Sequence, residues 1–173
     1  AQGSGSVGGA AEAGDHFGAA VSVADLDCDG YADLVVGVPG EDVGGASDSG
    51  LVQMVWGAAG GPGTGRASRS LDQSTFGLRR HVGDRLGAAV DAQEQVGNDS
   101  TEAPEAYAVA VGVPGYDVGG HRDAGLVTYE APDPRTGVLA DAWFTQDSRG
   151  VPGKAETGDQ LGSVVAVVYP AGG

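Results

Sequence analysis

The most chemically distinctive part of the sequence is the stretch DLDCDGYAD from Asp25 to Asp33, in which four carboxylates fall within nine residues. Four negative charges this close together repel one another unless a cation neutralises them. A hard divalent ion with about six to eight oxygen ligands suits such a set, and calcium is preferred over magnesium because a flexible, carboxylate-rich cage fits the larger ion. The sequence therefore predicts one calcium ion bound by this stretch.

The predicted ligands are the side chains at positions 1, 3, 5 and 9 of the stretch and the backbone carbonyl at position 7, that is, Asp25, Asp27, Asp29, Asp33 and Tyr31. Gly30 permits the sharp bend, because glycine adopts positive φ freely. The spacing also occurs in helix–loop–helix calcium hands, which need a bidentate Glu at position 12. This chain has Val36 at that position, so the EF-hand interpretation fails, and the remaining alternative is a solvated acidic turn.

The segments around this stretch form a repeat of about 70 to 75 residues. LVVGVPGEDVGGASDSGLV from Leu34 recurs as AVAVGVPGYDVGGHRDAGLV from Ala108. A second signature occurs three times, as GDHFGAAV from Gly14, GDRLGAAV from Gly83 and GDQLGSVV from Gly158. The chain has 33 glycines in 173 residues, well above the usual share of about 7%, and each unit is typical of short strands between glycine-rich turns.

Strands are predicted near residues 17–24, 32–38, 51–56 and 71–76, then near 86–92, 106–113, 126–130 and 139–145, and finally near 161–168. Four strands in each repeated unit indicate the blade of an all-β propeller. We therefore expect blade one at about 14–77, blade two at about 83–147 and the start of a third at about 158–173. Closed propellers need about four to eight blades, so the remaining blades are expected from a longer chain or from another copy of this one.

The second unit departs from the first at the acidic stretch. It keeps Asp91 but loses the alternating carboxylates and is longer by about six residues. Glu94, Asn98 and Asp99 could form an irregular site, but the lost spacing favours a surface loop without metal. Only the first unit is therefore predicted to bind calcium.

No group of residues typical of a catalytic site stands out. His16, His81 and His121 lie in predicted loops without a matching partner. The G-x-S-x-G motif of serine hydrolases is missing, and GSGSVG near the start has neither the preceding strand nor the following helix of a nucleotide site. The sequence predicts no catalytic or cofactor-binding residue and no enzyme.

Other polar and aromatic residues are interpreted as structural. The carboxylates that recur in turns and long loops are Asp15, Asp84 and Asp159, Asp42 and Asp117, and Asp48 and Asp123. Such residues commonly accept backbone N–H bonds in turns. Trp56, Trp143 and Tyr129 fall in outer strands, where packing is expected and glycan stacking is the alternative. Cys28 occupies a non-ligating position of the acidic stretch.

The net charge of −15 excludes two classes of partner. A surface this acidic repels the phosphate backbone of nucleic acids and anionic membranes. The sequence also has no run of 18 apolar residues, so no membrane span is predicted.

Phe17-Gly18, the acidic stretch and Gly37-Val38-Pro39 together resemble the FG-GAP repeat. The second and third units have Leu86 and Leu161 in place of Phe17. This repeat builds the propeller of integrin α subunits and occurs in related bacterial extracellular proteins. The resemblance implies a structural calcium site in the hairpin between the first two strands of a blade.

The resemblance also implies a function. We expect a non-catalytic, calcium-binding propeller segment of a secreted or cell-surface protein that mediates adhesion by binding an extracellular protein or glycan. The alternative is an accessory propeller of a secreted hydrolase whose catalytic domain lies outside this chain.

Overall fold

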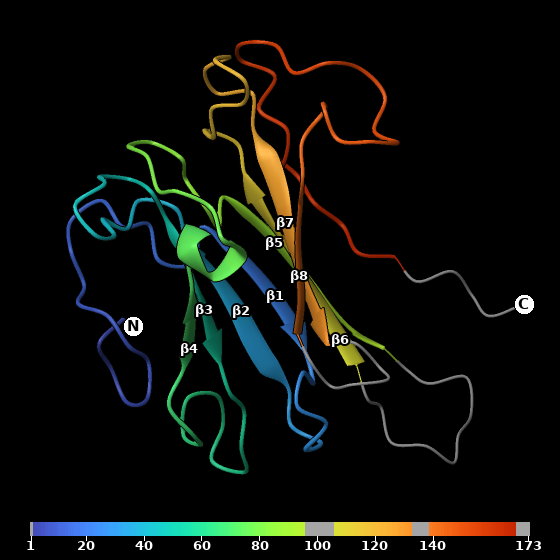
Figure 1. The fold of residues 1–173 in the computed structure, drawn as a ribbon. Helices are drawn as coiled ribbons and strands as arrows, with labels where there is room; N and C mark the ends of the chain where they lie inside the picture. The colour runs from blue at the N-terminus through green and yellow to red at the C-terminus, as the bar shows by residue number, and fades with distance from the viewer. Residues whose placement is uncertain (1, 96–105, 133–138, 169–173) are drawn as a thin grey trace, which may run out of the picture.

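The protein consists of two four-stranded antiparallel sheets that lie against each other (Figure 1). The computed structural model describes residues 2–95, 106–132 and 139–168. The first sheet has the order β1 (Ala20–Ala24), β2 (Asp33–Val38), β3 (Leu51–Val55) and β4 (Arg69–Leu71). The second has the order β5 (Ala89–Gln95), β6 (Ala106–Val113), β7 (Leu126–Pro132) and β8 (Leu139–Phe144). The predictions of an all-β fold and of propeller-type blades are confirmed.

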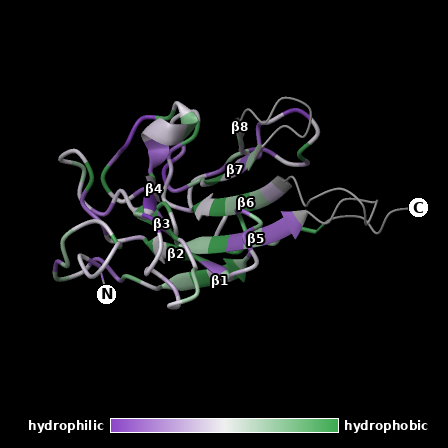
Figure 2. Cartoon of the chain, turned by 90° about the horizontal axis from the view of Figure 1, so that it is seen from below, coloured by the Kyte–Doolittle hydropathy of each residue, from purple (hydrophilic) through white to green (hydrophobic). Residues whose placement is uncertain are grey.

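Apolar side chains fill the space between the two sheets. Successive residues of a strand point to opposite faces, so the register of Val35 opposite Met54 places both on the same face of the first sheet. These side chains are fully buried in one cluster with Val109 and Val111 of β6. Figure 2 shows β1 and β5 side by side, with β5 turning hydrophilic towards its end.

Close backbone contacts fix the spacing between successive units. A Cβ atom on Gly37 of β2 would collide with the carbonyl oxygen of Gly87, just before β5. The same contact recurs one unit later, where a Cβ atom on Gly112 would collide with the carbonyl oxygen of Gly162. Only glycine at these strand positions allows the next unit to approach so closely.

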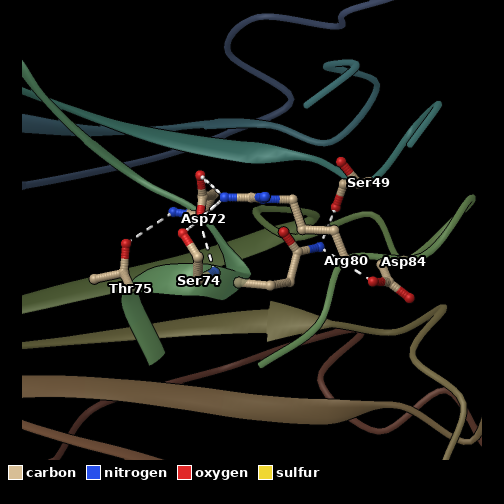
Figure 3. A network of polar contacts seen from close by, with 7 residues as sticks. Ser49, Asp72, Ser74, Thr75, Arg80 and Asp84 are labelled. Atoms are coloured by element: carbon tan, nitrogen blue, oxygen red, sulfur yellow. Dashed lines mark hydrogen bonds and ion pairs between the residues drawn. The ribbon is translucent and has the colours of Figure 1, made fainter. Parts of the chain in front are cut away.

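The segment that links the two sheets contains η1 (Gln73–Phe76), the only helix among the described residues. Asp72 caps it by accepting hydrogen bonds from the backbone and side chain of Ser74, and Arg80 pairs with the same carboxylate at 3.0 Å (Figure 3). Burial raises the pKa of Asp72, but the bonds from Ser74 and Arg80 outweigh it and hold the pKa below its ordinary value.

The prediction of a strand at 71–76 was therefore wrong in position. The fourth strand ends at Leu71, because the Asp72 side chain competes for the backbone N–H groups that a strand would need. Gln73 is fully buried instead, and its side-chain amide donates to the Ser49 carbonyl at 2.6 Å, which ties the linker to the first sheet.

The strand predicted at 161–168 does not form. Leu161 makes a single parallel bridge to Gly125, and the N–H of Val167 donates to the Asp91 carboxylate at 2.7 Å. This segment thus follows the second sheet, but no strand among the described residues pairs with it. Val164 and Val168 remain 86% and 81% exposed, so burial does not stabilise an extended conformation here.

The recurring carboxylates order turns and loops, as predicted. Asp15, Asp84 and Asp159 each accept the backbone N–H of the residue three positions earlier. In the long loops after β2 and β6, Asp42 accepts the N–H of Asp48, and Asp117 accepts the N–H of Asp123, both at 2.9 Å.

Candidate metal centre

The acidic stretch forms the connection between β1 and β2, and its own backbone holds it in shape. Asp25 accepts the N–H groups of Asp29 and Gly30 at 3.1 and 2.9 Å. Asp29 accepts the N–H of Tyr31 at 2.9 Å. Gly30 has φ of 87°, a left-handed conformation that glycine adopts without steric cost. The connection is therefore a tight loop whose carboxylates are positioned by the chain itself.

The loop brings Asp25, Asp27 and Asp29 together. Each offers a carboxylate oxygen, and these three oxygens all lie within 4.8 Å of one another. Calcium–oxygen distances are about 2.3–2.6 Å, so two ligand oxygens of one calcium ion are at most about 5 Å apart. A carboxylate oxygen that accepts one N–H keeps a lone pair for a metal. The separation and chemistry of the three side chains fit a calcium ion.

Asp33 and Tyr31 are placed differently. Asp33 is fully buried, and its two oxygens accept the N–H of Leu26 at 2.8 Å and of Gly57 at 2.7 Å. It therefore joins the acidic loop to the turn after β3 and does not belong to the three-carboxylate cluster. The side chain of Tyr31 is 44% exposed. The assignment of Asp33 and of the Tyr31 carbonyl as ligands stays a prediction.

Arg66 also lies at this site, although nothing in the sequence indicates it. Its guanidinium group lies 2.7 Å from Asp27 Oδ2 and 3.6 Å from the ring centre of Trp56. Arg66 comes from the glycine-rich turn between β3 and β4, far from the acidic loop in sequence. No local spacing relates the two, so only the three-dimensional structure reveals the contact.

The crowding of negative charge affects the protonation equilibria in the loop. Burial raises the pKa of Asp27, and the nearby charge of Asp33 raises it further, whereas the positive charge of Arg66 opposes both. Burial also raises the pKa of the Cys28 thiol, together with the charges of Asp25 and Asp27. In both groups burial is the largest cause, and the surrounding negative charge acts in the same direction.

The corresponding loop of the second unit is described only in part. Asn98 and Asp99 lie outside the described residues. Asp91 accepts hydrogen bonds from Ser22 in β1 and from Val167, so it connects neighbouring units. Glu94 is exposed and borders a cleft of about 410 Å³ that residues of the acidic loop also line.

Two further hollows lie near the loops that follow β2 and β6. One, of about 530 Å³, is lined by residues that include His16, Arg85 and Asp123. The other, of about 510 Å³, is lined by Trp143, Tyr116 and residues around them. Trp56 is 7% exposed, as expected of a packing residue, whereas Trp143 is 47% exposed, so packing of Trp143 against a further blade stays a prediction. Trp143 lies on β8 and borders the same hollow as Leu78 of the segment between the two sheets.

Residues 17–53 match the family model of the FG-GAP repeat. No curated protein matches the chain. The matched segment runs from Phe17, through the acidic loop, into β3. This segment of the first sheet is therefore similar to an FG-GAP repeat.

Among the residues that the structure describes, no helix is long and apolar enough to cross a membrane.

Proposed function

We propose that this chain is a calcium-stabilised, non-catalytic propeller segment that presents its loops to a protein or glycan outside the cell. The observation that carries the proposal is the cluster of Asp25, Asp27 and Asp29 inside an FG-GAP repeat. Modules of extracellular proteins bind calcium with dissociation constants of about 10⁻⁴ to 10⁻³ M. A site of that strength suits a secreted or surface-exposed protein.

Calcium stabilises the first blade because only the folded loop gathers the three carboxylates. A ligand at ten times its dissociation constant stabilises the folded state by about 1.4 kcal/mol. For a chain of this length, that energy corresponds to about 3 to 6 °C in melting temperature. A chelator should therefore lower the melting temperature by this amount.

The test compares melting curves with calcium and with chelator for the unmodified protein and two variants. Asp27→Ala should abolish the difference between the two conditions. Glu156→Ala removes an equal charge from an exposed position in the linker after β8, and it should keep the full difference. Identical curves for the unmodified protein with calcium and with chelator would rule out a stabilising calcium site.

Ligand binding is proposed for the hollow that contains Trp143. Exposed aromatic rings offer a flat apolar face to a sugar ring, and Asp117 in the same hollow can accept hydrogen bonds from hydroxyl groups. A screen of immobilised glycans and extracellular proteins tests this part, with Trp143→Ala as the variant that should lose binding. Binding that survives this change would place the ligand surface elsewhere.

We also propose that a further blade, from a longer chain or another copy, packs on the free face of β1. Val21 and Val23 are 52% and 57% exposed there. The equivalent residues of the second sheet, Val90 and Ala92, pack into the core between the two sheets. The molecular mass in solution tests whether another copy supplies the blade, because a monomer would exclude it.

A further inference from the structure

Arg66 forms an ion pair with a carboxylate of the candidate metal centre, so the protein itself supplies a positive charge at this site. Its Nη2 atom lies 2.7 Å from Asp27 Oδ2, a charge-assisted hydrogen-bond distance. Among the described residues, it forms the only salt bridge that reaches Asp25, Asp27 or Asp29. The guanidinium group thus neutralises part of the charge that a metal ion would otherwise neutralise.

The surroundings of Arg66 hold it beside the loop. The guanidinium carbon lies 3.6 Å from the ring centre of Trp56, a cation–π contact with a side chain that is 7% exposed. Arginine suits this position because its planar group can stack on the ring and donate to a carboxylate at the same time. Gly57, the residue after Trp56, donates its N–H to Asp33 at 2.7 Å, so this hydrogen bond holds the turn that carries Trp56 against the acidic loop.

We propose that Arg66 is a built-in counter-ion that competes with calcium for Asp27 and thereby sets the calcium affinity of the loop. This inference rests on the proposed calcium site. Asp27 Oδ2 faces the guanidinium group, and two cations at one carboxylate repel each other. Calcium binding therefore breaks the ion pair between Arg66 and Asp27, while the Trp56 ring continues to hold the arginine nearby.

Two consequences follow for the protein. Without metal, Arg66 reduces the repulsion among the carboxylates, so the loop keeps its shape. With metal, the displacement of Arg66 costs part of the binding free energy, so calcium binds more weakly and more reversibly than to the three carboxylates alone. Arg66 is thus an affinity-setting residue and not a ligand.

The test is a calorimetric titration with calcium chloride of the unmodified protein and of three arginine variants. Arg66→Gln removes the charge but keeps a hydrogen-bonding side chain, and it should bind calcium about tenfold more tightly. Arg66→Lys keeps the charge without the planar group, and its calcium affinity should lie between that of the unmodified protein and that of Arg66→Gln. Arg149→Gln removes one charge from an exposed position in the linker after β8 and should leave the affinity unchanged.

Tryptophan fluorescence tests the displacement itself. The chain has two tryptophans, so Trp143→Phe leaves Trp56 as the single reporter. Calcium should change the emission of Trp56 when Arg66 is present. The change should fall by at least about half in Arg66→Gln, because this variant has no guanidinium group whose contact with the Trp56 ring could change.

The outcomes separate this inference from the proposed function. If the unmodified protein binds calcium but Arg66→Gln binds it equally or more weakly, the counter-ion role is overturned and the calcium site stands. An emission that calcium leaves unchanged, in a protein that binds calcium, also overturns the displacement of Arg66. If the unmodified protein takes up no calcium at millimolar concentration, both the site and the role of Arg66 are overturned.

Discussion

The ion pair between Arg69 and Glu130 provides a stringent test of how the two sheets hold together. Arg69 in β4 donates to both oxygens of Glu130 in β7, at 2.7 and 2.8 Å. The hydroxyl of Tyr107 in β6 donates to the same carboxylate at 2.9 Å. Glu130 is fully buried, whereas the side chain of Arg69 is 33% exposed. The contact joins the outer strand of the first sheet to the interior of the second.

Replacement of Arg69 by methionine leaves the Glu130 charge buried, and Tyr107 is then its one side-chain hydrogen-bond donor among the residues that the structure describes. Breaking a buried ion pair by removing one partner costs about 3 to 5 kcal/mol. Because Arg69 is partly exposed, water can reach the carboxylate once the arginine is gone. The loss should therefore fall near the lower end, about 3 kcal/mol.

Urea denaturation at neutral pH measures this loss in the free energy of unfolding. The double variant Arg69→Met, Glu130→Gln should recover about 2 kcal/mol of it, since a neutral amide costs less to bury than an unpaired carboxylate. Arg149→Met serves as the control, and it should change the stability by less than about 0.5 kcal/mol, as exposed substitutions do. A loss below about 1 kcal/mol for Arg69→Met would refute the conclusion that this pair fastens the sheets.

Three further predictions concern the loop, the packing and the response to pH. Asp33→Ala should lower the free energy of unfolding in urea by about 2 to 4 kcal/mol even with chelator present, because it leaves two buried N–H groups without acceptors; a loss seen only with calcium would make Asp33 purely a ligand. Gly37→Ala should cost about 3 kcal/mol in the same assay because its Cβ atom collides with a backbone carbonyl. Gly8→Ala, where the nearest atom to the new Cβ is 3.5 Å away, should cost almost nothing. Burial, with the charge and hydrogen bond of Glu130, raises the pKa of Tyr107 to about 12, above its unfolded value of about 10. The stability that Tyr107 contributes should therefore be complete below about pH 10 and should disappear as the pH rises from about 10 to 12. Urea titrations across this pH range measure the dependence, and Tyr107→Phe should remove it.

Sequence alone predicted the elements whose signals are local. β2 and β6 lie where runs rich in valine end at the G-x-P signature, and both are buried on their two faces as such runs predict. The acidic loop was located because its carboxylates alternate over a few residues. The turn carboxylates were also found, because each accepts a hydrogen bond within its own turn.

The features that the sequence did not predict correctly have related physical causes. Each depends on groups that are distant in sequence or on competition between two local structures. The segment at 161–168 has strand-like residues, but a strand forms only where another strand pairs with it. Asp72 and Ser74 replaced an extended chain by a capped turn. The contact between Arg66 and Asp27 joins two loops that share no sequence pattern.

A crystal structure of the protein grown with calcium would show whether the acidic loop holds a metal ion. We expect one ion in the loop between β1 and β2, bonded to carboxylate oxygens of Asp25, Asp27 and Asp29 at about 2.3–2.6 Å. Crystals that contain millimolar calcium but show only water among these three side chains would rule out a calcium site in this loop.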